Sequence, residues 1–288
     1  MLVAAAVALA LAACSGGHQS AAPKAKPTSA PKPKPASTSA QTTRPESKPN
    51  PPAAPKAKPA KRKPKPPATH HRARSPRHAV PHGIPWHSDG VSLVARTRGR
   101  WLAIYGRPGA KRPLLVLRNP DGNGTPRVVL VRSQRPGWVR VYLPTRPNER
   151  TGWIRERAVR LLKNPYRLVV DVRRHRLELW KERRLVLHAT TVVGASTTPT
   201  PLGMYYVVEL LRPPDPHGSY GPYSFGISAH SNVLKRFAGG DGRVGIHGTD
   251  APWLLGSSVS HGCVRVGNDT IRRLARVLPL GTPVMIRS

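Results

Sequence analysis

The interpretation of this 288-residue sequence rests on two short segments, Gly245-Ile246-His247-Gly248-Thr249 and Ser257-Ser258-Val259-Ser260-His261-Gly262-Cys263-Val264-Arg265. The second segment contains Cys263, one of the two cysteines in the chain. A thiol with a free pKa of about 8.5 is mostly protonated at neutral pH, so its attack on a carbonyl needs a neighbouring base or cation. Two histidines and an arginine in these segments are close enough in sequence to provide that help. The pattern therefore indicates a reactive cysteine.

Two other interpretations of this cluster stay open. His247, His261 and Cys263 are zinc ligands by type, although no acidic or thiol residue suggests itself as the fourth ligand. Cys263 could instead be a buried structural residue beside two hydrogen-bonded histidines, which is the usual role of an isolated His or Cys. The clustering of three reactive side chains favours chemistry at the cysteine, and we expect no metal.

Together the two segments resemble the active-site signature of the L,D-transpeptidase family. That signature is a His-Gly pair, a spacer of variable length, and then Ser or Thr-His-Gly-Cys followed by a hydrophobic residue and Asn or Arg. Every fixed position is matched here. Residues 198–203 also resemble the family's turn before a strand, and residues 280–286 resemble its closing strand. The resemblance covers the chain from about Tyr166 to Ile286.

The resemblance implies a cysteine acyltransferase that acts on peptidoglycan stem peptides and needs no cofactor. The cysteine would attack the carbonyl of the third stem residue, usually meso-diaminopimelate, and expel the terminal D-alanine to leave a thioester. An amine of a neighbouring stem would then give a 3→3 cross-link. Water as the acceptor would make the protein an L,D-carboxypeptidase, and attachment of a protein or an unusual D-amino acid also stays open. Acylation by carbapenems is implied as well.

The resemblance also assigns a role to each residue of the signature. Cys263 is the nucleophile, His247 is the base that takes its proton, and the backbone carbonyl of Gly248 orients the imidazole. The loop before the cysteine is shaped by Ser260, His261 and Gly262, and the N–H groups near Gly262 and Cys263 are candidates for an oxyanion hole.

Arg265 and residues 220–232 have less definite roles. Arg265 would either bind a substrate carboxylate through its guanidinium fork or form a salt bridge that stabilises the loop. Residues 220–232 are rich in Gly, Ser and aromatic side chains. Their position alone suggests a lid or groove over the stem peptide.

Residues 164–288 are expected to form a mostly β domain with one or two short helices. Strand-like runs cover 167–172, 176–180, 185–193 and 204–210, and the first two are separated by a tight turn near Arg174 and His175. One amphipathic helix would be capped by Asn268 or Asp269. Its apolar residues recur at helical spacing, at Ile271, Leu274, Ala275 and Leu278.

Residues 88–163 are expected to form a small antiparallel β barrel of five or six strands. Apolar runs at 101–105, 113–117, 128–131 and 138–143 are separated by turn signals at 119–124 and 144–148. The segment from Gly137 to Ile154 resembles the closing hairpins of bacterial SH3-like domains. Such a module would either bind wall material or simply pack against the neighbouring domain.

The first 13 residues are typical of a lipoprotein signal peptide. Residues 2–13 form an apolar run of 12, shorter than the roughly 20 residues needed to span a bilayer. Leu11-Ala12-Ala13-Cys14-Ser15 resembles the bacterial lipobox, in which Cys14 becomes the lipidated first residue. An ordinary cleaved signal is the alternative, and a start further upstream stays open because no Lys or Arg precedes the run. In either case we expect export to the outer face of the cytoplasmic membrane or the cell envelope.

Residues 14–87 are expected to be a long disordered tether. Positions 15–79 contain no Val, Ile, Leu, Met, Phe, Trp or Tyr, but they do contain 15 Pro and 15 Lys or Arg. Little there can offset the entropy lost on ordering. Such a cationic spacer would either grip polyanions, such as anionic wall polymer or lipid head groups, or remain merely solvated. Nucleic acid is not an expected partner of an exported chain.

The charge and composition of the whole chain bound its function. With 48 Lys and Arg against 13 Asp and Glu, the net charge of +35 favours anionic surroundings. Two cysteines cannot build a disulfide framework, and an aromatic content of 5% argues against an RNA-binding sheet of stacked rings. A non-catalytic module that grips anionic wall polymer is the alternative of another class. The paired His247 and Cys263 argue against it.

Overall fold

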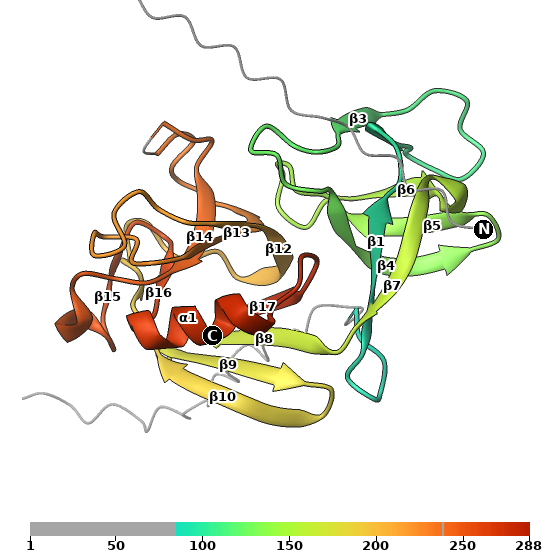
Figure 1. Ribbon diagram of the computed structural model, residues 1–288. Helices are drawn as coiled ribbons and strands as arrows, with labels where there is room; N and C mark the ends of the chain where they lie inside the picture. The colour runs from blue at the N-terminus through green and yellow to red at the C-terminus, as the bar shows by residue number, and fades with distance from the viewer. Residues whose placement is uncertain (1–84, 238) are drawn as a thin grey trace, which may run out of the picture. The chain divides into compact units, whose positions relative to one another are not determined.

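The computed structural model of the protein describes residues 85–237 and 239–288 (Figure 1). The expected signal peptide (1–13), the lipidation site at Cys14 and nearly all of the expected tether (14–87) lie outside the described residues. The described part is mainly β, as expected, with a single α-helix among those residues. No helix in the described ranges has the length and apolar character needed to cross a membrane.

A five-stranded antiparallel sheet forms first along the chain, in the order β6-β5-β4-β1-β7. Its strands are β1 (Ser92–Thr97), β4 (Val128–Arg135), β5 (Trp138–Tyr142), β6 (Thr151–Arg155) and β7 (Val159–Asn164), with a 3₁₀ turn, η1 (Glu156–Ala158), before β7. A separate hairpin pairs β2 (Trp101–Ile104) with β3 (Leu115–Arg118), and Tyr105 bridges it to Trp153 of β6. The region therefore has seven strands, one or two more than expected, because the short hairpin β2-β3 adds to the five-stranded sheet.

The second sheet has eight strands in the order β10-β9-β8-β17-β12-β13-β14-β16. These are β8 (Tyr166–Asp171), β9 (Arg176–Lys181), β10 (Arg184–Thr190), β12 (Gly203–Leu211), β13 (Ser224–His230), β14 (Arg243–His247), β16 (Val264–Arg265) and β17 (Pro283–Arg287). The pairs β8-β17 and β14-β16 are parallel and the other neighbours antiparallel. A separate parallel pair joins β11 (Val193–Gly194) to β15 (Ser258–Ser260), and η2 (Pro252–Leu254) is a 3₁₀ turn. The expected turn between the first two strands is present, with His175 at φ 48°.

The α-helix α1 (Asn268–Val277) lies where the sequence pattern predicts it. Ile271 and Leu274 are fully buried and pack with strands from across the second sheet. Figure 1 shows the helix in front of the strands, with β8–β10 to one side and β12–β14 to the other. The predicted cap is wrong in one respect, because Gly267 occupies the N-cap position and no side chain caps the helix. The side chain of Asn268 instead accepts a hydrogen bond from the backbone N–H of Thr249, at 2.9 Å.

Strand β12 is buried on both faces and joins the two sheets. Successive side chains of a strand point to opposite faces. Tyr205 and Val207 accordingly pack into the core of the second sheet, whereas the alternate residues Met204, Tyr206 and Val208 pack among apolar side chains of the first. Because β12 also leads to the cavities described below, the first sheet supports the strand from which one wall of those cavities is built.

Candidate active site

The site forms on one face of strands β12, β13 and β14, where two rows of facing residues cross the sheet. One row is Leu211, Ser224 and His247, and the other is Glu209, Gly226 and Gly245. Along each strand the residues of the two rows are two positions apart, so both rows lie on the same face of the sheet. The two glycines of the second row carry no side chains, which leaves room for the side chain of Glu209 to lie over Gly226.

His247 ends strand β14 and is held in one orientation by its neighbour. Its Nδ1 atom lies 2.7 Å from the carbonyl oxygen of Gly248, so Nδ1 carries the hydrogen and Nε2 is the basic nitrogen. The residue is only 4% exposed. Burial lowers the pKa of His247 to about 4, helped by the nearby charge of Arg265 and opposed by the bond to Gly248. The imidazole is therefore neutral at neutral pH.

Cys263 follows β15 in a tight loop and precedes β16. The Oγ atom of Ser260 accepts a hydrogen bond from the N–H of Gly262 at 3.2 Å and donates one to the carbonyl of Cys263 at 2.6 Å. Gly262 itself has φ 114°, which favours glycine. The N–H of Gly245 points at the sulfur, at 3.4 Å. Burial raises the pKa of the Cys263 thiol, although that N–H and the charge of Arg265 oppose the rise.

The structure brings four of the predicted residues of the signature into one small cavity, whereas Gly248, Ser260 and Gly262 do not line it. His247, His261, Cys263 and Arg265 line a space of about 90 Å³ together with three other residues, Ser219, Tyr220 and Phe237. The ring of Tyr220 lies 4.8 Å from that of His247, and the exposed ring of His261 stacks on Phe237 at 5.1 Å. Among the described residues no three His, Cys, Asp or Glu side chains are placed to hold a metal ion.

The side chain of Arg265 has no acidic partner among the described residues. Its side chain is half-buried, and its Nε atom is buried with no hydrogen-bond partner among the residues that the structure describes. No Asp or Glu of the described ranges forms an ion pair with it. The salt bridge considered from the sequence is therefore absent there.

A second cavity of about 500 Å³ opens beside Cys263, and sequence reasoning did not find it. It is lined by Glu209, Arg243 and Gly226 among others, and Tyr220, Phe237 and Cys263 belong to both cavities. The one available signal was Glu209, an acid inside the apolar run Met204 to Leu211. The run reads as a plain buried strand because no local pattern reveals which side chains face a cavity.

Residues 220–232 were expected to form a lid or groove; most of the segment is a strand rather than a lid, and Tyr220, Ser224 and Gly226 line the larger cavity. Residues 224–230 form strand β13, in which Phe225, Ile227 and Ala229 are buried in the core. Tyr220, before the strand, does line the site. Beyond the strand, Arg146 donates to the carbonyls of Ser231, Leu234 and Asp241, and this loop brings Phe237 to the site.

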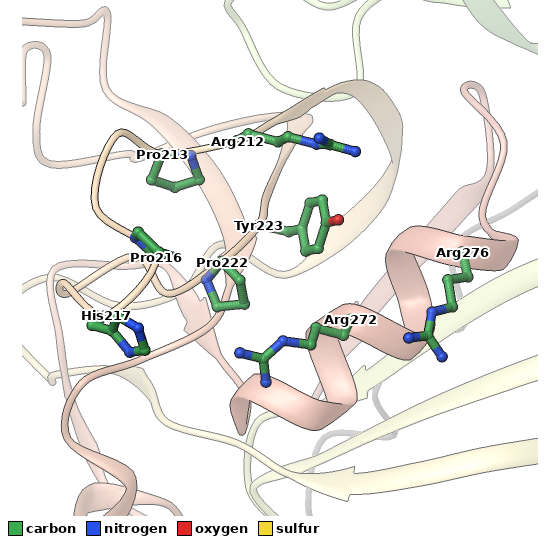
Figure 2. Close-up of a pocket in the computed structure, with 8 residues that line it drawn as sticks. All are labelled: Arg212, Pro213, Pro216, His217, Pro222, Tyr223, Arg272 and Arg276. Carbon is green, nitrogen blue, oxygen red and sulfur yellow. The ribbon is translucent and has the colours of Figure 1, made fainter.

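A third cavity of about 400 Å³ lies on the other side of the loop that follows β12 (Figure 2). Arg272 and Arg276 of helix α1 line it together with Tyr223 and the prolines of that loop, and Figure 2 shows Arg272 extending from the helix toward the loop. Arg212 and His217 add further nitrogen groups to it, and Arg212 also lines the cavity beside Cys263. It contains neither the thiol nor the imidazole, so it is a basic neighbour of the site and not the place of reaction.

Comparison with known proteins identifies the class of domain. Residues 165–286 match the sequence profile of the YkuD family, the L,D-transpeptidase catalytic domain. Proteins of Bacillus licheniformis and Bacillus subtilis, both provisionally named L,D-transpeptidase YkuD, are 35% and 32% identical over 122 residues, which is 42% of this chain and 66% of each relative. A solved L,D-transpeptidase from Enterococcus faecium is 23% identical, with a TM-score of 0.34, over 43% of this chain and 50% of that one.

Residues 165–286 thus match the L,D-transpeptidase catalytic domain, which confirms the resemblance seen in the sequence. This match covers 42% of the chain. The matched segment spans just under two thirds of the length of the curated relatives.

Proposed function

We propose that this protein is a peptidoglycan L,D-transpeptidase whose nucleophile is Cys263 and whose base is His247. The observation that carries the proposal is the bond from Nδ1 of His247 to the carbonyl of Gly248. It leaves Nε2 as the basic nitrogen of a ring that lines the same cavity as the thiol. A neutral imidazole beside a protonated thiol is the resting pair from which general-base activation of the sulfur starts.

In the first half-reaction, His247 takes the thiol proton as the sulfur attacks the carbonyl of the third stem residue. The oxyanion that forms is stabilised by the backbone N–H of Cys263, because the N–H of Gly262 already donates to Ser260. Collapse of this intermediate breaks the bond to D-alanine, whose nitrogen takes the proton from His247. A thioester on Cys263 remains.

In the second half-reaction, an amine of a neighbouring stem attacks the thioester and forms a 3→3 cross-link. The thiol is restored as the amide forms. The free energy of the broken bond to D-alanine is conserved in the thioester and drives formation of the cross-link, so no cofactor is required. The unpartnered Nε of Arg265 supports a role in binding a substrate carboxylate at this centre. Water or a protein amine as the acceptor would give a carboxypeptidase or a protein-attachment enzyme instead.

We place this activity outside the cytoplasmic membrane, where peptidoglycan is found. Members of the family act on the cell wall, and a lipidated Cys14 with a cationic tether would hold the catalytic domain there. The described residues carry 33 Lys and Arg against 12 Asp and Glu, which favours association with anionic wall polymer or lipid head groups. The SH3-like module of residues 88–163 would contribute to that association or support the catalytic domain.

The proposal is tested by incubating the purified protein with a disaccharide-tetrapeptide and following the products by mass spectrometry, beside the Cys263→Ala variant. We expect a dimer lighter by one D-alanine that the variant does not form. Tripeptide alone would indicate a carboxypeptidase. The absence of any Cys263-dependent product would reject catalysis and favour the non-catalytic wall-binding module.

A further inference from the structure

The larger cavity beside Cys263 has a single acid, Glu209, among the described residues that line it. Glu209 interrupts strand β12, in which every residue from Gly203 to Val208 is buried. It is only 7% exposed itself, and burial of an ionised carboxylate is costly unless the charge is paired. Its partner Arg243 lines the same cavity, which Cys263 also lines, so a carboxylate and a guanidinium face a space beside a reactive cysteine and indicate a binding role.

The backbone aims this carboxylate along the sheet toward the cysteine. The pairing of β12 with β13 shifts between Val207 and Glu209, and such a bulge redirects the side chain that follows it. Glu209 then faces Gly226, which faces Gly245, whose N–H contacts the sulfur of Cys263. The Oε1 atom of Glu209 lies directly over Gly226, where any β-carbon would collide with it.

The spacing of the strands sets the reach of the group. With neighbouring strands about 4.8 Å apart, the backbone of Glu209 lies about 10 Å from that of Gly245, and the glutamate side chain covers roughly half of this distance. An ammonium group bound to the carboxylate would therefore stand next to the sulfur of Cys263. An acyl group on that sulfur would present its carbonyl to this ammonium.

The carboxylate of Glu209 has one short hydrogen bond and one long ion pair among the described residues. The side-chain amide of Asn123 donates to Oε2 at 2.7 Å, whereas Nε of Arg243 lies 3.9 Å from Oε1. Nη2 of Arg243 lies 3.8 Å from Asp241, so both of its ion pairs are long, and its Nη1 donates a hydrogen bond to the carbonyl of Ile227 at 3.2 Å. Because Arg243 lines the same cavity, a carboxylate and a guanidinium stand side by side without a tight bond between them. Such a pair fits a ligand that carries both charges.

We propose that Glu209 and Arg243 bind the zwitterionic α-amino acid group of the acceptor stem, the free amino and carboxylate groups at the end of a diaminopimelate-type side chain. This assignment rests on the transpeptidase function proposed above and specifies its acceptor as an α-amino acid amine. Glu209 holds the ammonium and Arg243 holds the carboxylate.

The transfer step then balances as follows. The ammonium releases one proton to solvent, and the neutral amine attacks the thioester. The C–N bond forms and the C–S bond breaks. The second proton of the amine passes through His247 to the sulfur of Cys263, which returns the thiol.

The Glu209→Gln variant tests the assignment, because Gln keeps the shape and the bond from Asn123 but loses the charge. With a disaccharide-tetrapeptide as donor and acceptor, we expect the ratio of dimer to tripeptide to fall about tenfold or more, since a hydrogen bond between charged groups is lost. The ratio is read per D-alanine released in the first turnover, so a variant that only acylates more slowly leaves it unchanged. Glu178→Gln, which removes a carboxylate from β9, is the matched control. An unchanged ratio in Glu209→Gln would overturn the proposal.

The role of Arg243 is tested with two acceptor tripeptides, in which the carboxylate beside the free amine is either unmodified or amidated. We expect the unaltered protein to prefer the unmodified acceptor, and Arg243→Gln to lose that preference. Equal use of both acceptors by the unaltered protein would overturn the assignment of Arg243.

A binding measurement separates this site from the chemistry. The unmodified tripeptide is titrated into the Cys263→Ala protein by calorimetry, with and without Glu209→Gln. We expect binding about tenfold or more weaker in the double variant. Binding that depends on Glu209, together with no Cys263-dependent release of D-alanine, would reject the transpeptidase and retain the zwitterion site. Binding unaffected by Glu209→Gln would reject the site.

Discussion

Gly248, the residue whose carbonyl orients His247, lies directly against the side-chain oxygen of Asn268 at the start of helix α1. The same oxygen accepts the N–H of Thr249 at 2.9 Å. The loop after the imidazole is therefore fixed to the helix by a contact that leaves no space for a side chain at position 248.

This contact predicts that Gly248→Ala damages both stability and activity. A β-carbon there would collide with Asn268 and approach the backbone of Gly221 to 3.0 Å. We expect a loss of about 1–3 kcal/mol in the free energy of unfolding, typical of overpacking, measured by urea denaturation. D-alanine release should fall as well, because the carbonyl that holds Nδ1 of His247 is displaced. Gly106→Ala, at a glycine with no atom near its added β-carbon, controls for the cost of losing a glycine elsewhere. Equal stability of Gly248→Ala and the unaltered protein would contradict this account.

The low pKa of His247 predicts a pH dependence of stability. In the unfolded chain the histidine has its ordinary pKa of 6.5, and in the folded protein the pKa is about 4. Between these values the unfolded state binds more protons, so the free energy of unfolding rises with pH, by about 3 kcal/mol in all for this group. Denaturation at pH 4.5 and pH 7 measures the change.

The His247→Gln variant is the control for that measurement. It should show a smaller rise in stability between the two pH values, because the group that titrates is gone. Part of the rise should remain, since burial also lowers the pKa of His230. If stability rises as much in the variant as in the unaltered protein, folding does not lower the pKa of His247.

The raised pKa of Cys263 predicts slow alkylation by iodoacetamide but continued acylation by a carbapenem at pH 7. Iodoacetamide needs a thiolate, so at pH 7 it should alkylate Cys263 more slowly than free cysteine. A carbapenem should nevertheless acylate Cys263 at that pH, since His247 removes the proton during the attack. In His247→Gln we expect acylation to slow by about 100-fold or more while alkylation changes little. Intact-mass spectrometry follows both adducts. Rapid alkylation at pH 7 would instead indicate a preformed thiolate.

The sequence predicted the mainly β fold and the α-helix well, because both depend on local patterns. The apolar spacing of Ile271 and Leu274 is visible along the chain, as are the turn residues between strands. The sequence could not predict that Asn268 would bind the loop at Thr249 rather than cap its own helix. That contact joins residues 19 positions apart, and only the assembled sheet brings them together.

The candidate site was predictable only in part, for the same reason. His247 and Cys263 stand in a recognisable motif, so their proximity could be expected. Glu209 and Arg243 carry no motif, and they reach the cavity because β12, β13 and β14 are neighbours in a particular register. A register that is set by long-range packing and by a bulge cannot be inferred from the spacing of residues in the sequence.

The two adjacent tyrosines of strand β12 predict opposite effects of the same substitution. Tyr206 is fully buried, and its hydroxyl has no hydrogen-bond partner among the described residues. Tyr205 is also buried, but its hydroxyl donates to the carbonyl of Leu202 at 2.9 Å. A buried polar group without a partner costs about 1–3 kcal/mol, whereas a satisfied hydrogen bond contributes about 1 kcal/mol.

We therefore expect Tyr206→Phe to raise the free energy of unfolding by about 1 kcal/mol or more, and Tyr205→Phe to lower it by about 1 kcal/mol. Each change removes one hydroxyl oxygen, and the two positions are neighbours in one strand. Each variant therefore serves as the control for the other in urea denaturation. A loss of stability in Tyr206→Phe would mean that its hydroxyl is hydrogen-bonded, for instance to a buried water between the two sheets. In that case the side chains that join β12 to the first sheet would pack around a polar centre rather than a wholly apolar one.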